Sequence, residues 1–164
     1  MEGENNMAGL DLSTAGIHIY YGVETTAGTK PTDFTDIPKP MEIPQINAAP
    51  SMIKTTSLNE TTYETYIKGL IDVGSAIGIK FGLNDEFQEI WATLCTASET
   101  ARETGKATWF QVVVPDMKNA FFFTGQPSIL GFDATSPNSH LQDTAYITPN
   151  EIKGWSAKVV PSAP

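Results

Sequence analysis

The sequence predicts a mainly β protein: a β-sandwich or barrel with one α-helix packed on a face or edge. Several short stretches alternate apolar and polar residues, which is typical of half-buried strands. One stretch alone shows the three-to-four residue apolar period of an amphipathic helix. Proline and glycine clusters separate these stretches, as turns and loops do. The length of 164 residues and the apolar content of 40% suit one domain with a substantial core.

The first predicted strand, "IHIYYGVE" at residues 17–24, alternates cleanly. One face carries Ile17, Ile19, Tyr21 and Val23, and the other carries His18, Tyr20 and Glu24. Five prolines between Pro31 and Pro50 then exclude a long central strand, because proline has no N–H to donate to a ladder. We therefore expect residues 26–54 to form a long loop with short edge strands.

Residues 55–66 are rich in threonine and tyrosine, and their β-propensity predicts a strand that is polar on both faces. The next strand, "AIGIKFGL", points Ile77, Ile79, Phe81 and Leu83 inward. The helix is expected at about residues 84–103. Asn84 caps it, and the apolar stripe consists of Phe87, Ile90, Trp91, Leu94 and Cys95.

The remainder of the chain is expected to be β. "ATWFQVVVP" forms a strand, and "AFFFTGQPSIL" forms another that is broken near Gly125 and Pro127. "FDATSPNSHLQD" is a loop, and "PNEIK" joins two separate strands, "TAYIT" and "GWSAKVV". The chain thus divides into an N-terminal arm (1–16), a single β domain (17–160) and a C-terminal tail (161–164).

The charge pattern argues against a nucleic-acid docking surface, since 10 Lys and Arg face 19 Asp and Glu and the net charge is −9. The single cysteine, Cys95, excludes an intrachain disulfide and reads as a small buried apolar residue. The sequence has neither a secretory signal pattern nor an apolar run long enough to span a membrane, so we expect no membrane insertion.

Residues for catalysis are scarce. His18 and His140 are the only histidines, no pair stands at metal-ligand spacing, and no nucleotide-binding glycine pattern occurs. Asp85 and Glu86 are explained by the positive end of the helix dipole. We therefore expect no enzyme activity, no metal and no cofactor.

Four blocks in order carry a family resemblance: "GVETTAGTKPTDFTDIP", "TTSLNETTYETYIKGL", "KATWFQVVVPDMKNAFFFTGQPSILG" and "AYITPNEIKGW". Over residues 17–155 the chain resembles the tail tube (major tail) proteins of long-tailed bacteriophages, especially those of Gram-positive hosts. The resemblance implies a β-sandwich-like fold with a flanking helix. It also implies hexameric rings that share an inner β-barrel and stack into a tube for DNA ejection.

The resemblance further implies partners and location. The subunit would bind copies of itself, a tail-tip or baseplate initiator, a tape measure protein and a tail terminator. Double-stranded DNA would pass without specific binding, repelled by negative charge in the lumen. The protein would be made in the bacterial cytoplasm and end in the virion tail.

The arm and the long loop would reach neighbouring subunits and rings. The contact residues expected on this basis are Met7, Leu10, Leu12, Pro40, Ile43, Pro44, Ile46, Pro50, Thr56 and Tyr63. The carboxylates assigned to the lumen are Glu60, Glu64 and Asp72, with ordinary outer surface as the open alternative for each.

Three alternatives stay open. The first is a related ring former: a contractile-tail or bacteriocin-type inner tube, or a tail terminator. The second is a monomeric carbohydrate-binding or adhesive β-sandwich that stacks sugars on Tyr63, Tyr66 or Trp109. The third is a hydrolase, which lacks a recognisable nucleophile and base.

Removal of residues 1–16 is expected to leave a folded monomer that cannot form long tubes, because the resemblance assigns ring contacts to this arm. Circular dichroism would check the fold, and negative-stain electron microscopy would check assembly. Normal polymerisation of the truncated chain would show that the arm assignment is wrong.

Overall fold

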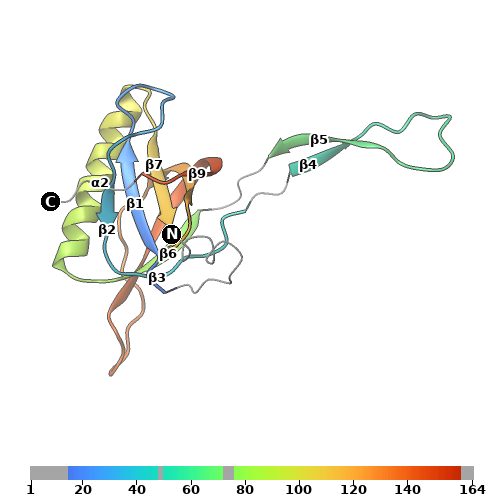
Figure 1. Ribbon diagram of the computed structural model, residues 1–164. Helices are drawn as coiled ribbons and strands as arrows, with labels where there is room; N and C mark the ends of the chain where they lie inside the picture. The colour runs from blue at the N-terminus through green and yellow to red at the C-terminus, as the bar shows by residue number, and fades with distance from the viewer. Residues whose placement is uncertain (1–14, 48–49, 72–75, 160–164) are drawn as a thin grey trace, which may run out of the picture.

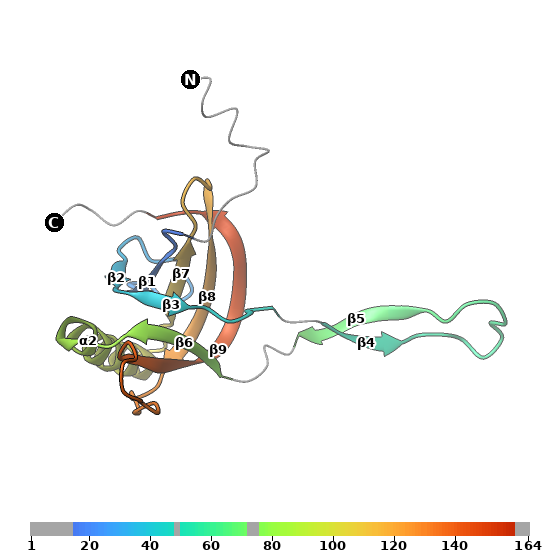
Figure 2. The same cartoon turned by 90° about the horizontal axis from the view of Figure 1, so that it is seen from below.

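The computed structural model describes residues 15–47, 50–71 and 76–159. Its main body is a 7-stranded antiparallel sheet that curls into a nearly closed barrel, in the order β2-β1-β7-β8-β9-β6-β3 (Figures 1 and 2). The barrel strands are β1 (His18–Val23), β2 (Thr35–Ile37), β3 (Pro40–Glu42), β6 (Ile77–Gly82), β7 (Thr108–Val113), β8 (Asn119–Pro127) and β9 (Gln142–Ala157). A separate sheet pairs β4 (Pro50–Lys54) with β5 (Tyr66–Ile71), and the α-helix among the described residues is α2 (Asp85–Glu103). The predicted mainly β class with a flanking helix is confirmed.

The two edges of the large sheet, β2 and β3, are consecutive in the chain. Residues 37–40, Ile-Pro-Lys-Pro, therefore carry the backbone directly from one edge to the other. Lys39 adopts a positive φ of 58° at this crossing, and its carbonyl accepts a 2.9 Å hydrogen bond from the N–H of Gly82. Proline costs little at a sheet edge because its missing donor breaks no ladder. The prediction of short edge strands within the proline-rich stretch is confirmed.

Helix α2 supplies much of the barrel's core. Asn84 caps it as predicted, since its Oδ1 accepts a 2.8 Å bond from the N–H of Phe87. The rings of Phe81 on β6 and Phe87 stack with centroids 4.8 Å apart, and Trp91 lies beside both. The core also contains Ile19, Tyr21, Ile37, Ile77, Ile79, Leu94, Phe110, Val112, Phe123, Ala145 and Ile147.

The outer face of β1, β7 and β8 is covered as well, so strand β7 is buried on both faces except at its last residue. Phe34, Trp109, Ala120 and Phe122 form a second apolar cluster there. The Lys30 ammonium lies 3.8 Å from the centroid of the Phe122 ring. The face predicted to be polar is therefore an interface with the chain that follows β1.

Glu24 lies within this cover although the sequence placed it on a polar face. Its carboxylate accepts hydrogen bonds from the Ala107 N–H (2.8 Å), the Trp109 indole N–H (2.8 Å) and the Gly28 N–H (3.1 Å). Burial acts to raise the pKa of Glu24, but these hydrogen bonds outweigh it and hold that pKa below its ordinary value. The carboxylate is thus a structural anchor for the loop after β1.

Strand β8 was predicted to be broken near Gly125 and Pro127; it continues through Gly125 with a shift in register and ends at Pro127. The prediction of two separate strands after the loop is wrong, because β9 is one strand of 16 residues. A register shift beside Gly125 accommodates the glycine, and a Cβ there would lie 2.7 Å from the Ile147 side chain. Pro149 is tolerated because the β6 ladder ends at Ile147, so β9 is an edge strand on that side.

Replacement of Trp91 by Ala is expected to lower the free energy of unfolding by about 3–5 kcal/mol, the usual cost of a large cavity. Its side chain is 1% exposed, and its indole N–H donates a 2.8 Å bond to the Ser128 carbonyl. Chemical denaturation followed by circular dichroism measures the change. Gln88→Ala, on the exposed side of the same helix, is the control and should be near neutral. Equal stabilities of the two variants would contradict the burial of the apolar stripe.

Candidate assembly surfaces

The projecting hairpin, residues 50–71, extends far from the barrel (Figures 1 and 2). Strands β4 and β5 pair in register at Ile53–Ile67 and Lys54–Tyr66. The predicted strand at residues 55–66 is wrong, because only Tyr66 belongs to a strand and the remainder is the tip loop of the hairpin. Short polar side chains bond to nearby groups there, which favours turns over a ladder.

The tip loop has a defined internal structure. Glu64 accepts a 2.7 Å bond from the Lys54 ammonium and a 2.6 Å bond from the Tyr66 hydroxyl, and the pKa of Glu64 is lowered by these two bonds. Glu60 accepts the backbone N–H of Thr62 at 2.8 Å, and the backbone N–H of Tyr63 lies at 3.4 Å. These hydrogen bonds give the tip loop a defined conformation.

The hairpin has no core of its own. Every described side chain of β4 is exposed. The exposed large apolar side chains of the hairpin are Met52, Ile53, Leu58, Tyr63, Tyr66, Ile67 and Leu70. A two-stranded hairpin alone is marginally stable in water, and a contiguous exposed apolar surface marks an interaction site. The described part of the chain therefore leaves the apolar side chains of the hairpin exposed.

The hairpin gathers five of the residues that sequence reasoning singled out. They are Pro50, Thr56, Glu60, Tyr63 and Glu64. The pairing of β4 with β5 brings the end of the proline-rich segment against the threonine-rich one. The other members Met7, Leu10, Leu12 and Asp72 lie outside the described residues.

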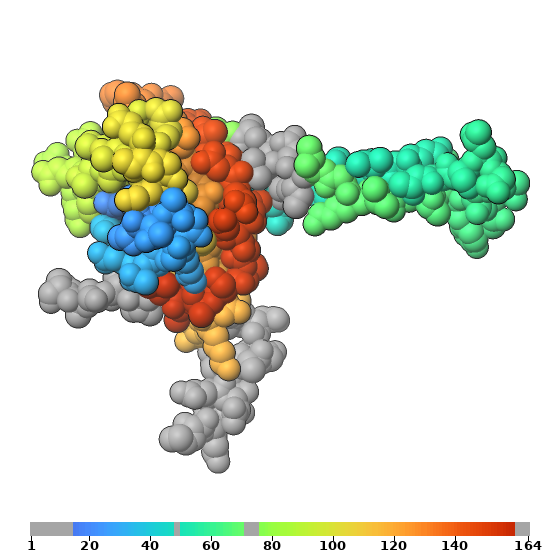
Figure 3. Space-filling view, turned by 90° about the horizontal axis from the view of Figure 1, so that it is seen from above, coloured from blue at the N-terminus to red at the C-terminus, as the bar shows by residue number. Residues whose placement is uncertain are grey.

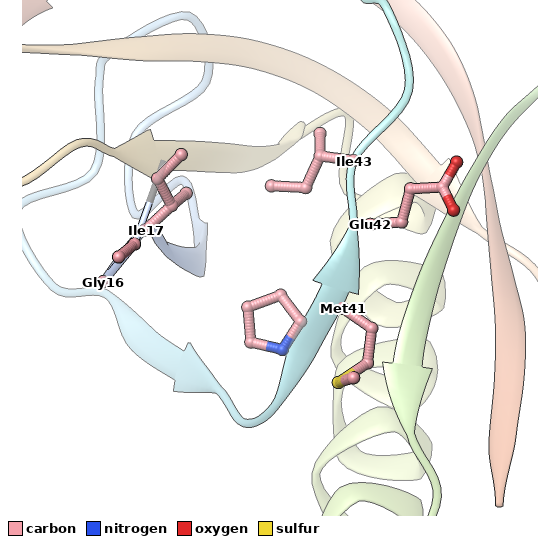
Figure 4. Close-up of a pocket in the computed structure, with 7 residues that line it drawn as sticks. Gly16, Ile17, Met41, Glu42 and Ile43 are labelled. Carbon is pink, nitrogen blue, oxygen red and sulfur yellow. The ribbon is translucent and has the colours of Figure 1, made fainter. Parts of the chain in front are cut away.

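The remaining predicted contact residues lie on the barrel. Pro40 and Ile43 line a hollow of about 470 Å³ between the chain entering β1 and strand β3 (Figure 4). Ile43 and Ile46 are half-buried and pack against the barrel core, so both have a role within their own chain. Pro44 is also half-buried. Nothing in the structure brings these four residues against the hairpin.

Sequence reasoning missed a second surface, the loop hollow, beside the loop before β9. It has a volume of about 630 Å³, and its lining residues are Lys80, Phe132, Asp133, Ala134, Thr135, Ser136, Ser139, His140, Leu141 and Gln142. Phe132 is 79% exposed, and nearby Ile129 is almost fully exposed. The sequence offered one sign of this surface: two large apolar residues, Ile129 and Phe132, stand beside a serine-rich loop.

Two carboxyl groups lie close to Thr144 at this hollow, one on the loop and one on β9. Asp133 accepts a 2.6 Å bond from the Thr144 hydroxyl, and Asp143 accepts a 2.9 Å bond from the Thr144 N–H. Asp143 is buried within the barrel wall. Burial raises the pKa of Asp143, and the nearby charge of Asp133 acts in the same direction.

Residues considered for chemistry do not converge. His18 lies 3.6 Å from an Asp36 oxygen, and His140 lies 3.3 Å from the Gln142 amide nitrogen. Within residues 15–47, 50–71 and 76–159, no three His, Cys, Asp or Glu side chains are placed to hold a metal ion. No helix in these ranges is long and apolar enough to cross a membrane.

Trp109 is too deeply buried to stack against a sugar. It is 6% exposed, and its indole N–H is bound to Glu24. Tyr63 and Tyr66 remain exposed on the hairpin. A carbohydrate site built on all three aromatic residues is excluded by this geometry.

No protein-family model matches the chain, and no curated protein matches it. Among solved structures, its fold is similar to that of a chain in the six-fold symmetrised cryo-EM structure of the anti-feeding prophage baseplate. The TM-score is 0.58 at 8% identity, over 88% of this chain and 95% of that one. The chain is similar in fold to a baseplate component.

A weaker likeness links the chain to the phage p2 baseplate in its activated conformation with Sr. The TM-score is 0.43 at 8% identity, over 85% of this chain and 45% of that one, which is too low to support an argument.

Asp143→Asn is expected to stabilise the protein at pH 7. The folded-state pKa of Asp143 is raised, so the fold is favoured at low pH and loses stability as pH rises through that pKa. The amide carries no charge and still offers an oxygen to the Thr144 N–H. Thermal unfolding should give a higher melting temperature for the variant at pH 7 and a smaller difference near pH 3.5. An unchanged or lower melting temperature at pH 7 would contradict this account of Asp143.

Proposed function

We propose that this protein is a structural subunit of a phage-like tail or baseplate that assembles with copies of itself. In the finer form of this proposal, hexameric rings stack into the tail tube of a long-tailed phage, through which DNA is ejected. The observation that carries it is the projecting hairpin, whose apolar side chains are exposed and are not covered by any of the residues that the structure describes. The fold it shares with a baseplate component in a six-fold assembly supports this reading.

The hairpin suits contact between subunits for a geometric reason. It stands away from the barrel in every direction from which the molecule is viewed (Figures 1, 2 and 3). Its apolar side chains cannot be covered by the barrel that carries them. A neighbouring subunit in a ring or stack would cover them and would offset the ordering cost of an otherwise marginal hairpin.

The charge of −9 fits a conduit that DNA crosses without adhering, because like charges repel the phosphate backbone. Glu60 and Glu64 lie at the hairpin tip and are bonded to tip residues. Their position favours a subunit contact over a place on the lumen wall. In this proposal the initiator, tape measure and terminator proteins are further partners.

A contractile-tail or bacteriocin-type inner tube, or a tail terminator, is the nearest competing identity, since such proteins are also ring formers. Electron microscopy distinguishes a tube protein from a terminator by the assembly that each forms. Stacked tubes of uniform width favour a tube protein, whereas single closed rings favour a terminator.

Replacement of residues 50–71 by a short Gly-Ser linker is expected to abolish rings and tubes and leave the barrel folded, because the hairpin shares no described core residue with the barrel. Negative-stain electron microscopy with light scattering of the concentrated protein checks assembly, and circular dichroism checks folding. Glu89→Gln on the exposed helix surface is the control and should assemble normally. Tubes formed by the chain without the hairpin would overturn the proposal.

A further inference from the structure

Two exposed apolar surfaces of this chain lie on different parts of the molecule. One is the tip of the projecting hairpin, and the other is the loop hollow beside Phe132. We propose that the hairpin tip of one copy docks into the loop hollow of a second copy. This inference rests on the proposed function and names the two surfaces that meet.

The tip loop offers two exposed apolar side chains on a backbone of defined conformation. Leu58 is fully exposed, and Tyr63 is 76% exposed. Both belong to the loop whose backbone is held by the Glu60 carboxylate and by paired Thr55 and Thr65, with Thr55 N–H donating to the Thr65 carbonyl at 2.8 Å. Preorganisation of this kind lowers the entropy lost on binding. The tip can therefore act as an anchor that enters a recess.

The loop hollow offers a matching recess. Its volume of about 630 Å³ can receive side chains of the size of leucine and tyrosine, and Phe132 and Leu141 give it an apolar wall. Asp133 is the one carboxylate among its lining residues, and it is held by the Thr144 hydroxyl. Polar side chains line the remainder, as expected for a rim that meets a threonine-rich tip.

Charge distinguishes this recess from the hollow beside β3. The tip loop carries two carboxylates, Glu60 and Glu64. The hollow beside β3 presents Glu42 and no cation among its lining residues, so it would place like charges together. The loop hollow presents the cation of Lys80 beside the carboxylate of Asp133, so its lining has a formal charge of zero, whereas that of the hollow beside β3 is −1. The ammonium of Lys80 is 3.6 Å from a Glu42 oxygen, a loose and exposed pair that leaves it accessible to a further carboxylate.

The geometry makes the contact head-to-tail. In Figure 1 the hairpin extends to one side of the barrel, and the loop before β9, coloured orange-brown, extends from its lower end. Figure 2 also separates them. One chain therefore cannot satisfy both surfaces itself. Each copy supplies a tip to one neighbour and a recess to another, and such heterologous contacts generate rings or open stacks.

Site-directed cross-linking tests the contact. One chain carries Thr62→Cys, beside the Tyr63 anchor, and another carries Ala134→Cys, in the lining of the loop hollow, both with Cys95→Ser so that each has a single thiol and keeps Tyr63 and Phe132. The two chains are mixed under assembly conditions and treated with a short bismaleimide. We expect the mixture to give a covalent dimer at least tenfold above the level given by either chain alone, because only the mixture places two thiols across the contact.

Two controls sharpen the result. Met41→Cys, from the hollow beside β3, replaces Ala134→Cys and should give no dimer above background when mixed with Thr62→Cys. Lys80→Glu, added to the Ala134→Cys chain, should reduce cross-linking several-fold. Melting temperatures of all variants should match that of the Cys95→Ser chain, since these side chains are exposed.

The outcomes separate this inference from the proposed function. Assemblies that form without the Thr62–Ala134 cross-link, or that cross-link through Met41, are compatible with the proposed function and show that the tip does not dock into the loop hollow. A wild-type chain that stays monomeric at every concentration, with no cross-link, contradicts both. A Thr62–Ala134 cross-link that Lys80→Glu weakens supports both the contact and its electrostatic part.

Discussion

Closure of the barrel depends on the aromatic side chains that helix α2 places against the sheet. Phe87 and Trp91 contact Phe81, so the helix and strand β6 hold the interior together. The strands can curl around this core because both edges of the sheet are short and are joined by the same segment of chain. Strands β2 and β3 are not paired with each other in the sheet, so the proline-rich segment between them completes the barrel wall at this point. A stable barrel then leaves the hairpin free to serve contacts outside the chain.

The sequence predicted the elements whose signal is local. The helix followed from an apolar stripe and a capping asparagine, and strands β1, β6 and β7 followed from alternation. The continuity of β9 could not be predicted, because Pro149 reads as a break unless one knows that β6 stops pairing at Ile147. The burial of Trp109 depends on the segment after β1, which includes Glu24, so the residues next to Trp109 in the sequence do not predict it.

For the projecting hairpin, the sequence indicated the unusual composition of its two segments but did not predict that they pair. The proline-rich and threonine-rich segments were both recognised as unusual, yet their union in one hairpin depends on long-range pairing between β4 and β5. Polar composition also concealed the apolar side chains at the tip, since Leu58 and Tyr63 stand singly among threonines and charges. The loop hollow was missed for the same reason. Surfaces of this kind are formed when the fold brings distant residues together, so the local sequence pattern predicts them poorly.

Strand β9 lies between β8 and β6 in the sheet, although it follows both of them in the sequence. Until its residues leave the ribosome, β6 has only the three-residue β3 as a partner, and the barrel wall is open between β6 and β8. Folding of this barrel is therefore a late, long-range event, of the kind that proceeds slowly because distant strands must meet. The hairpin is translated well before that event. A nascent chain thus displays the exposed apolar hairpin before β9 can complete the barrel, and the subunit contacts proposed above would have to wait for β9.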